Sequence, residues 1–460
     1  MPRHAMISNT SRSLRSLIPL GSAALLGFSV LPAWGQSPAT PAMPVVSNVA
    51  VQAPEPITLQ SAIAMAMASN AELSVARREL EAAEGPVLQG SARPNPELSF
   101  LLEDTQRATR TTTLQINQPI ELGGKRAARI SAAERGRDIA AAELAAKRAD
   151  LRATVVSAFH DVLLAQEQVK LASDSTELAR RAADAAGKRV QAGKVSPVEE
   201  TKARVAEATA RLEAAQATSA LRLSRQRLAA TWGDAVPRFE RVSDRTELTG
   251  DLMPALMPVL TLDALSARLA TSPSLRRAQI EVQRRSALSD LERARRTPDL
   301  TVSLGVKRDE QLGRTQAVLG LSIPLPLFDR NQGNLLEALR REDKSRDELA
   351  AADIQLKTAA MQAWGRLDSA AAQAQILRDQ VLPGAQSAYD AATRGFELGK
   401  FNFLDVLDAQ RTLFQAKAQY LRTRGEAHRA AADIDRLLGD VGGAAEPPLP
   451  TEPNRSRSKS

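Results

Sequence analysis

The chain has 460 residues, of which 61 are Lys or Arg and 53 are Asp or Glu, and it contains no Cys. This length is typical of two or three domains, or of one architecture built from repeats. Because Cys is absent, disulfide scaffolds, thiolate metal sites and Cys nucleophiles are excluded. Apolar residues make up 43% of the chain but aromatic residues only 3%. This balance favours close contacts between Ala-rich helices over a bulky globular core.

The amino terminus, residues 1–35, has the pattern of a secretory signal peptide. Three arginines precede an apolar run from Leu17 to Leu31, and Ala33-Trp34-Gly35 is a small-x-small cleavage pattern. An uncleaved membrane anchor is the alternative, but Pro19 and two glycines interrupt the run, which is short for a spanning helix. Removing three arginines from a formal charge of +8 leaves +5. The protein is predicted to be exported, without a Cys to carry an N-terminal lipid.

Two similar halves make up most of the remaining chain. Four short markers of the first half return in the second at offsets of 203, 202, 205 and 206 residues. The marker pairs begin at Ile57 and Leu260, Pro96 and Pro298, Leu114 and Leu319, and Ala192 and Leu398. One slowly drifting offset indicates a tandem duplication. The predicted segments are a signal peptide (1–35), a flexible leader (36–56), a first repeat (57–250), a second repeat (251–438) and a disordered tail (439–460).

Each half contains two segments in which apolar side chains occupy every second position, as in a β-strand. The alternating residues are Leu98, Phe100, Leu102, then Thr112, Leu114, Ile116, and in the second half Leu300, Val302, Leu304, Val306, then Ala317, Leu319, Leu321, Ile323. Short polar loops at 104–110 and 308–314 separate the members of each pair. Each half is therefore predicted to carry one β-hairpin.

The other long segments carry heptads, which predict coiled-coil helices. Apolar residues recur every seven positions at Leu356, Ala363, Ala370 and Leu377, and at Val406, Leu413, Tyr420, Ala427 and Ile434. The helix from Arg126 to Ala172 would measure ~70 Å at ~1.5 Å per residue. The predicted fold class is mainly α with a small β part, in which tandem-repeat long coiled-coil helices accompany four strands per chain.

Two kinds of break interrupt these helices in the sequence. Asp174-Ser175 and Pro383-Gly384 are predicted to form tight helix-to-helix turns. Further along, the sequences GKVSPVEE (193–200) and GKFNFLD (399–405) are predicted to restart a helix. Ser196 would be the first N-cap, with Pro197 at the first helical position, and Asn402 would be the second N-cap.

Four alternating strands of ~8–11 residues suit a membrane-spanning β-segment, which needs ~9–11 tilted residues. Four strands cannot close a barrel, however, and open strand edges are not tolerated in lipid. Three copies of the chain would supply twelve strands, an even number within the known range. The alternative is that two ordinary hairpins end a soluble helical protein.

The chain resembles the outer-membrane efflux proteins of the TolC type over about Ile57 to Leu438. The resemblance rests on the duplicated plan and on the motifs NQPIELGGKR (117–126), SIPLPLFDRNQG (322–333) and RGFELGKFNFLDVLDAQ (394–410). The first two motifs resemble those of the heavy-metal branch, the outer-membrane subunits of cobalt–zinc–cadmium or copper–silver efflux systems. The resemblance implies a homotrimer with a twelve-stranded β-barrel in the outer membrane and a twelve-helix α-barrel in the periplasm. It also implies a periplasmic adaptor (membrane fusion protein) and a proton-driven inner-membrane pump of the RND type as partners.

Two groups of site residues follow from this resemblance. The candidates for the periplasmic tip and its aperture are Ser173, Asp174, Arg378, Asp379 and Gln380. The candidates for a hinge near the middle of the tunnel are Gly193, Ser196, Pro197, Gly399 and Asn402. A ring of Asp from three chains would favour cations, and the alternative is that these charges are merely solvated beside a turn.

Catalytic, cofactor and resident metal sites are not expected. After signal removal only His160 and His428 remain, far apart in sequence, whereas zinc or copper sites need more nitrogen or sulfur ligands. The arginines between 284 and 296 alternate with carboxylates, which indicates a solvated helix face and not a nucleic-acid surface. The predicted function is a passive outer-membrane exit duct for heavy-metal cations. The alternatives are a multidrug or type I secretion channel and, from another class, a soluble periplasmic coiled-coil adaptor or scaffold.

Overall fold

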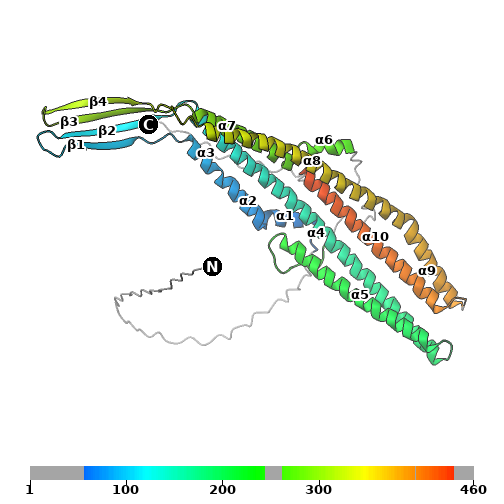
Figure 1. Ribbon diagram of the computed structural model, residues 1–460. Helices are drawn as coiled ribbons and strands as arrows, with labels where there is room; N and C mark the ends of the chain where they lie inside the picture. Colours follow the sequence, from blue (N-terminus) through cyan, green and yellow to red (C-terminus); the bar gives the residue numbers. More distant parts are fainter. Residues whose placement is uncertain (1–55, 244–261, 399, 440–460) are drawn as a thin grey trace, which may run out of the picture. The chain divides into compact units, whose positions relative to one another are not determined.

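The computed structural model describes residues 56–243, 262–398 and 400–439 (Figure 1). The predicted signal peptide and nearly all of the predicted leader and C-terminal tail lie outside the described residues. The first half contains α1 (Leu59–Ser69), α2 (Ala71–Ala82), α3 (Glu84–Ser91), β1 (Glu97–Glu103), β2 (Thr111–Ile120), α4 (Lys125–Gln191) and α5 (Pro197–Ala230). The second half contains α6 (Leu262–Leu269), α7 (Pro273–Arg295), β3 (Leu300–Asp309), β4 (Arg314–Ser322), α8 (Gln332–Ile376), the π-helix η3 (Leu377–Val381), α9 (Leu382–Glu397) and α10 (Phe403–Leu438). Both halves follow the order helix, hairpin, very long helix and second long helix, so the predicted hairpin in each half is confirmed.

The two hairpins join into one antiparallel sheet of four strands in the order β1-β2-β3-β4. The pairing of β2 with β3, with Leu114 opposite Val306, connects the two halves. The strand spans agree with the predicted alternation, except that β3 continues to Asp309 and β4 begins at Arg314, both inside the predicted loop, and Ile323 lies after β4. Within the described residues, β1 and β4 each have a neighbour on one side only, so the outer edge of each carries backbone groups without a strand partner.

The long helices pack through narrow seams of small residues. The 67 residues of α4 make a helix about 100 Å long at ~1.5 Å per residue, and it packs on α5, α7 and α10. The predicted seam on α8 is confirmed, because Leu356, Ala363, Ala370 and Leu377 are all buried. Alanine at two of these four positions lets the neighbouring backbones approach closely.

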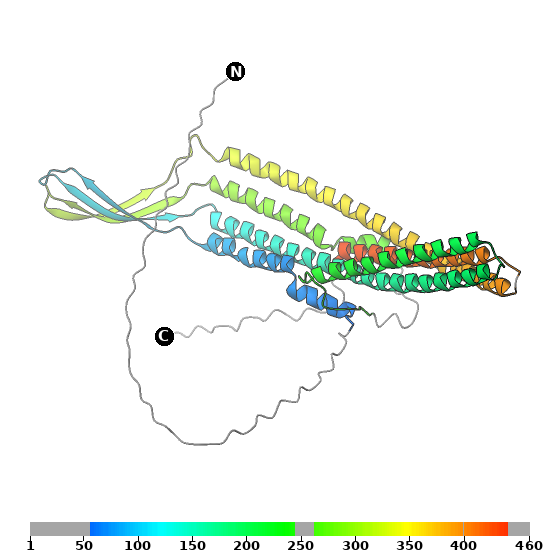
Figure 2. The same cartoon turned by 90° about the horizontal axis from the view of Figure 1, so that it is seen from below.

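Each half has a larger apolar cluster of its own around a short helix. In the first half, α1 contributes Ala62 and Ala66 to a core that also contains Phe159 of α4 and Val242. In the second half, α6 contributes Leu265 and Leu269 to a core with α7, α8 and α10. Figure 2 shows the long helices side by side from a second direction. The duplication in the sequence is thus matched by duplicated packing.

The structure corrects one prediction about the helices. Helix α4 passes through Asp174 and Ser175 without a break, and α8, η3 and α9 follow one another directly through Pro383. The predicted turns at these two places are wrong. Ala172 and Ala179 are buried on either side of Asp174, so the packed face holds the helix together while the polar residues face solvent. At Pro383 the helix widens: the amide of Leu382 bonds five residues back to Leu377, which accommodates a residue that cannot donate.

Ion pairs fix the passage from the strands into the helices. The guanidinium of Arg129 in α4 contacts both carboxylate oxygens of Glu121, at 2.5 and 3.2 Å, and also donates to the carbonyl oxygens of Gly90 and Ala92. Asp299, before β3, accepts from Lys125 at 2.7 Å and from the amide of Leu122. The two bonds of Asp299 cross between the halves, so the segment before β3 is tied to the start of α4.

The Glu121–Arg129 pair predicts a pH dependence of stability. Hydrogen bonding from Arg129 lowers the pKa of Glu121 below its ordinary value. A carboxylate with a lowered pKa contributes stability above its unfolded pKa and loses it as the pH falls through the folded pKa. Glu121→Gln should therefore reduce the free energy of unfolding by about 1–3 kcal/mol at neutral pH, and the difference from the native chain should shrink below pH ~4.

Denaturant unfolding of the purified protein at several pH values measures this effect. Glu177→Gln is the matched control, because Glu177 forms an exposed pair with Arg181 within α4, and it should change the free energy by less than about 1 kcal/mol. Equal effects of the two substitutions at neutral pH would contradict the assigned role of Glu121.

Candidate functional site

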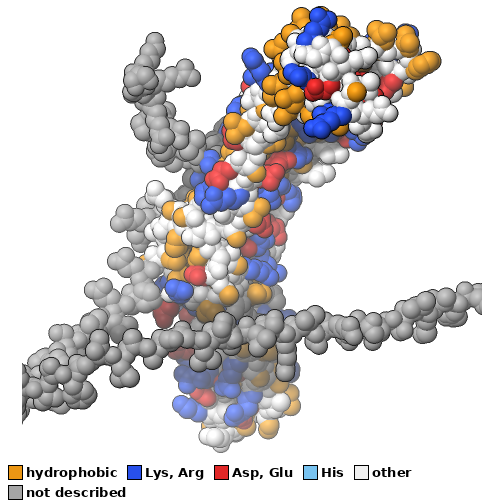
Figure 3. Space-filling model, turned by 90° about the vertical axis from the view of Figure 1, so that its left-hand side faces the viewer, with side chains coloured by type: hydrophobic (Ala, Val, Ile, Leu, Met, Phe, Trp, Pro, Cys, Tyr) orange, Lys and Arg blue, Asp and Glu red, His pale blue; other side chains and the backbone are white. Residues whose placement is uncertain are grey.

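One face of the four-stranded sheet is apolar and exposed. In the register of the sheet, Leu98, Ile116, Leu304 and Leu319 form one cross-strand row, and Phe100, Leu114 and Val306 belong to the next row on this face. All seven are exposed large hydrophobic residues. Figure 3 shows hydrophobic side chains on the flanks of the end that carries the strands, whereas charged side chains of both signs are interspersed along the helices.

The opposite face of the sheet is polar. Asn117 donates to Ser99 at 3.1 Å and accepts from Ser303 at 2.7 Å, so a hydrogen-bonded chain runs across three strands. Further along, Lys307 lies 3.7 Å from Glu103. Gly305 lies opposite Gln115 on the neighbouring strand. A larger residue does not fit there, because its Cβ would lie 2.5 Å from the Gln115 side chain. A sheet with one exposed apolar face and one polar face is suited to separate lipid from water.

The helix-to-helix turns lie at 192–196 and 398–402, where the sequence analysis expected hinges. Gly193 has φ +67°, and the amide of Lys194 bonds back to the carbonyl of Arg189 at 2.9 Å, so α4 ends in a Schellman motif. The second turn has the same bond, from the amide of Lys400 to the carbonyl of Gly395 at 2.8 Å. Both turns therefore end one long helix and begin another.

The caps predicted after these turns are confirmed. Ser196 is the N-cap of α5, its hydroxyl accepts from the amide of Val198, and Pro197 is at the start of the helix. Asn402 is the N-cap of α10 and forms a capping box with Asp405, whose carboxylate accepts from the Asn402 amide at 2.9 Å. Gly399 lies outside the described residues. These residues end helical hairpins, and their predicted position half-way along the tunnel stays a prediction.

The two turns are neighbours in space. The guanidinium of Arg189, near the end of α4, lies 4.5 Å from the centre of the Phe396 ring in α9. Ala183, Ala186 and Ala203 of the first half share an apolar cluster with Phe396 and Leu407 of the second. Beside this cluster, Val198, Leu398 and Phe401 are exposed. The paired turns thus present one surface with apolar side chains and the lysines Lys194 and Lys400.

The residues predicted to line an aperture are exposed but lie away from the turns. Ser173 and Asp174 are in α4, and Arg378, Asp379 and Gln380 are in η3, which packs on α10. The guanidinium of Arg378 donates to Asp379 at 2.7 Å and holds the pKa of that carboxyl below its ordinary value. Asp174 precedes Gln191 by 17 residues, which is about 26 Å of helix. The aperture role of these five residues stays a prediction.

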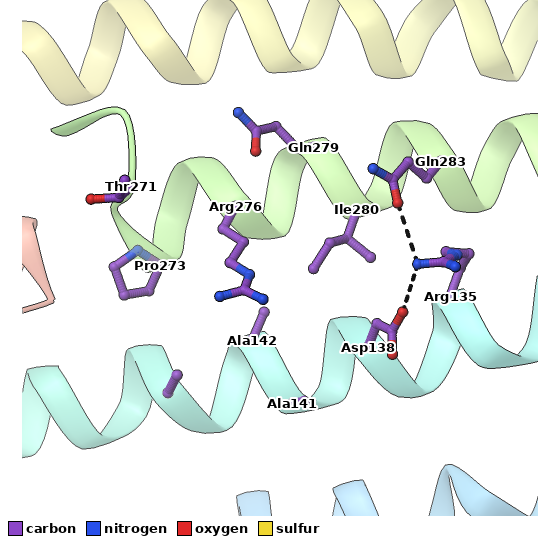
Figure 4. Close-up of a pocket in the computed structure, with 11 residues that line it drawn as sticks. Arg135, Asp138, Ala141, Ala142, Thr271, Pro273, Arg276, Gln279, Ile280 and Gln283 are labelled. Carbon is purple, nitrogen blue, oxygen red and sulfur yellow. Dashed lines mark hydrogen bonds and ion pairs between the residues drawn. The ribbon is translucent and has the colours of Figure 1, made fainter. Parts of the chain in front are cut away.

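A groove between α4 and α7 has a volume of about 530 Å³ (Figure 4). Arg135 spans it, donating to Asp138 of the same helix at 2.8 Å and to Gln283 of α7 at 3.4 Å. Arg276 and Ile280 line the same space. The lining carries two arginines against one carboxylate, so its net charge does not favour a cation.

One contact between the halves was missed by the sequence analysis. The imidazole rings of His160 in α4 and His428 in α10 stack with their centres 4.0 Å apart. They are 268 positions apart, so only the packing register of the two helices could have revealed the contact. Across the described part of the chain, no group of three or more His, Cys, Asp or Glu side chains could hold a metal ion. None of the described helices is long and apolar enough to span a membrane.

Comparison with known protein families matches residues 62–234 and 264–440 to the family described as "Outer membrane efflux protein". The chain belongs to this family. The resemblance to TolC-type channels and to their heavy-metal branch is therefore confirmed, and membership places this outer membrane efflux protein in the outer membrane with its long helices in the periplasm.

The relatives of this efflux protein include two metal-resistance proteins. The chain is 52% identical over 388 residues to the cobalt-zinc-cadmium resistance protein CzcC of Cupriavidus metallidurans, a match that covers 84% of this chain and 91% of the relative. It is 30% identical over 337 residues to the nickel and cobalt resistance protein CnrC of the same organism, covering 70% and 73%. Among solved structures, the outer membrane protein VceC of Vibrio cholerae has the same fold, with a TM-score of 0.68 and 19% identity over 83% of this chain and 96% of that chain.

The left-handed turn residue gives a testable prediction for the outer membrane efflux protein. A Cβ on Gly193 would meet nothing within 4 Å, so Gly193→Ala should act through the backbone alone and cost about 1 kcal/mol of unfolding free energy. Gly136, inside α4, is equally unobstructed, and Gly136→Ala should instead stabilise by about 0.5–1 kcal/mol. Denaturant unfolding of both variants checks this. A stabilised Gly193→Ala variant would show that the turn does not need its left-handed residue.

Proposed function

We propose that the protein is the outer-membrane channel of a tripartite efflux system and a passive exit duct for heavy-metal cations. The assignment of heavy-metal cations as the cargo rests on the 52% identity to a cobalt-zinc-cadmium resistance protein over 84% of the chain. The geometry supports the duct, because a sheet with one polar face leads directly into helices about 100 Å long. The proton-driven inner-membrane pump of the RND type supplies the energy, and the channel itself does no bond chemistry.

A homotrimer supplies what the single chain lacks. The outer edges of β1 and β4 need strand partners in lipid, and three copies make a closed barrel of twelve strands. Helix α5 offers a second contact surface, because Val205 and Leu212 are exposed at seven-residue spacing, opposite the buried Ala203, Ala210 and Ala217. An exposed heptad seam of this kind fits a helix from a neighbouring copy. The twelve-helix tunnel then follows from four helices per chain.

The paired turns at 192–196 and 398–402 are the proposed periplasmic tip. Their exposed Leu398, Phe401 and Val198, with Lys194 and Lys400, form a surface on which the helical hairpin of a periplasmic adaptor can dock. Asp174 and the Arg378–Asp379 pair would then line the tunnel about 26 Å of helix above the tip, and not at the tip itself. In three copies, the ionised carboxylates favour the passage of cations.

The cargo is tested by deleting the gene and measuring survival of the host on zinc, cadmium, cobalt, nickel and copper salts and on a panel of drugs. The deletion strain should become sensitive to at least one of the divalent metals, and the native gene on a plasmid should restore tolerance. Its drug tolerance should not change. Immunoblotting of outer-membrane fractions confirms that the plasmid-borne protein is present.

The pattern of sensitivities separates the alternatives. Lost drug tolerance with unchanged metal tolerance would contradict the metal cargo and favour a multidrug channel. A protein found soluble in the periplasm would contradict the channel itself.

A further inference from the structure

An exposed apolar segment continues the lipid-facing row of β4 beyond the end of the strand. Leu319 and Leu321 are exposed on the apolar face of the sheet, and Ile323, Leu325 and Leu327 continue the same two-residue spacing after the strand ends at Ser322. Phe328, the next residue, is 91% exposed. This apolar surface lies where the strands meet the helices, which is the periplasmic edge of the membrane segment.

Three arginines adjoin this segment. Arg295 and Arg296, at the end of α7, and Arg330, just before α8, line a pocket of about 300 Å³ together with Leu325 and Asp329. Arg295 is paired with Glu292 at 2.6 Å, and Arg330 donates to the carbonyl of Pro326 at 3.3 Å. The exposed side chain of Arg296 has no carboxylate partner among the described residues.

The walls of this arginine pocket are fixed. Asn331 has φ +58°, and its side-chain amide donates to both the carbonyl oxygen and the carboxylate of Glu292, at 3.0 and 2.7 Å. The backbone amide of Asn331 also donates to the Asp329 carboxylate at 2.8 Å. These bonds tie the segment after β4 to the end of α7. The acidic groups at the pocket are thereby engaged, while the guanidinium of Arg296 remains available to an anion.

We propose that the arginine pocket binds the phosphate of a phospholipid head group in the periplasmic leaflet of the outer membrane. The inference rests on the proposed function, in which the strands cross that membrane. Arginine recognises phosphate through several donors at once, and apolar side chains beside it, with Phe328 at the interface, insert among the acyl chains. Charge complementarity and continuity with the lipid-facing strand row select a lipid over a protein partner. Each copy of the chain would thus hold one lipid where barrel and tunnel meet.

Lipid retention by the purified full-length protein tests this site. The protein is delipidated in detergent, titrated with phosphatidylglycerol, and examined by native mass spectrometry for bound lipid per chain. The native chain should hold one phosphatidylglycerol per copy. The double variant Arg296→Gln/Arg330→Gln should bind it about tenfold more weakly, since two charge-assisted contacts to phosphate are lost.

A second pair of arginines provides the matched control. Arg293→Gln/Arg340→Gln removes the same charge from exposed helical positions whose arginines pair with Asp290 and Asp343, and binding should stay at the native level. Equal loss in both double variants would overturn the proposal, because attraction would then be unspecific. Displacement of the lipid by millimolar inorganic phosphate would also overturn it, because the pocket would then be a general anion site.

Failure of this inference is distinguishable from failure of the proposed function. Each variant is first located by density-gradient separation of the membranes. A native chain absent from the outer membrane would refute the channel and the lipid site together. A native chain present there that holds no more phosphatidylglycerol than the Arg296→Gln/Arg330→Gln variant would refute the lipid site alone.

Discussion

The need to satisfy backbone hydrogen bonds in lipid is the constraint on which the rest of the account depends. The sheet exposes Leu98, Leu304 and Leu319 on one face and keeps Asn117 and Ser303 on the other, so its place in a bilayer is favourable only if its edges are closed. Four strands cannot close on themselves, because β1 and β4 end the sheet on opposite sides. The chain therefore becomes a stable membrane segment only with further copies of itself. Assembly, and with it a tunnel, follows from this requirement.

Small residues on the helices allow the same assembly to continue away from the membrane. Helix α4 buries Ala172, Ala179 and Ala186 along the side that meets its neighbours, and the polar side chains of the other face remain solvated. Because alanine side chains are small, the packed face of α4 needs little space along its length. A helix of 67 residues can therefore run from the strand junction to the turn without a bulky core. The bonds of Arg129 and Asp299 at the junction then transmit the arrangement of the strands to the helices.

Strands and helices with one apolar face could be predicted from the sequence. Whether a helix ends at a helix-breaking residue could not, because this depends on packing between helices. The alternation in β3 reflects one apolar and one polar face of the sheet, and the heptads of α8 reflect burial on one side of the helix, so both were predicted correctly. Asp174 and Pro383 are local helix breakers, but Ala seams and the widened turn of η3 overrule them. The true turns carried a usable signal, since a C′ glycine, Gly193, is followed within three residues by the N-cap Ser196. The His160–His428 stack depends on the register between distant helices and had no local signal.

Pairing of strand edges between copies is the most direct test of the central claim. The native chain has no Cys, so a disulfide between copies can arise only from introduced residues. Leu101→Cys in β1 is combined in turn with Cys at Gln316, Ala317 or Val318 in β4, and outer membranes are oxidised and run without reducing agent. The account predicts that at least one pair gives covalent dimers and trimers, and that Leu101→Cys alone gives no trimer. Only monomers across the whole series, from protein that is present in the outer membrane, would contradict closure of the sheet by neighbouring copies.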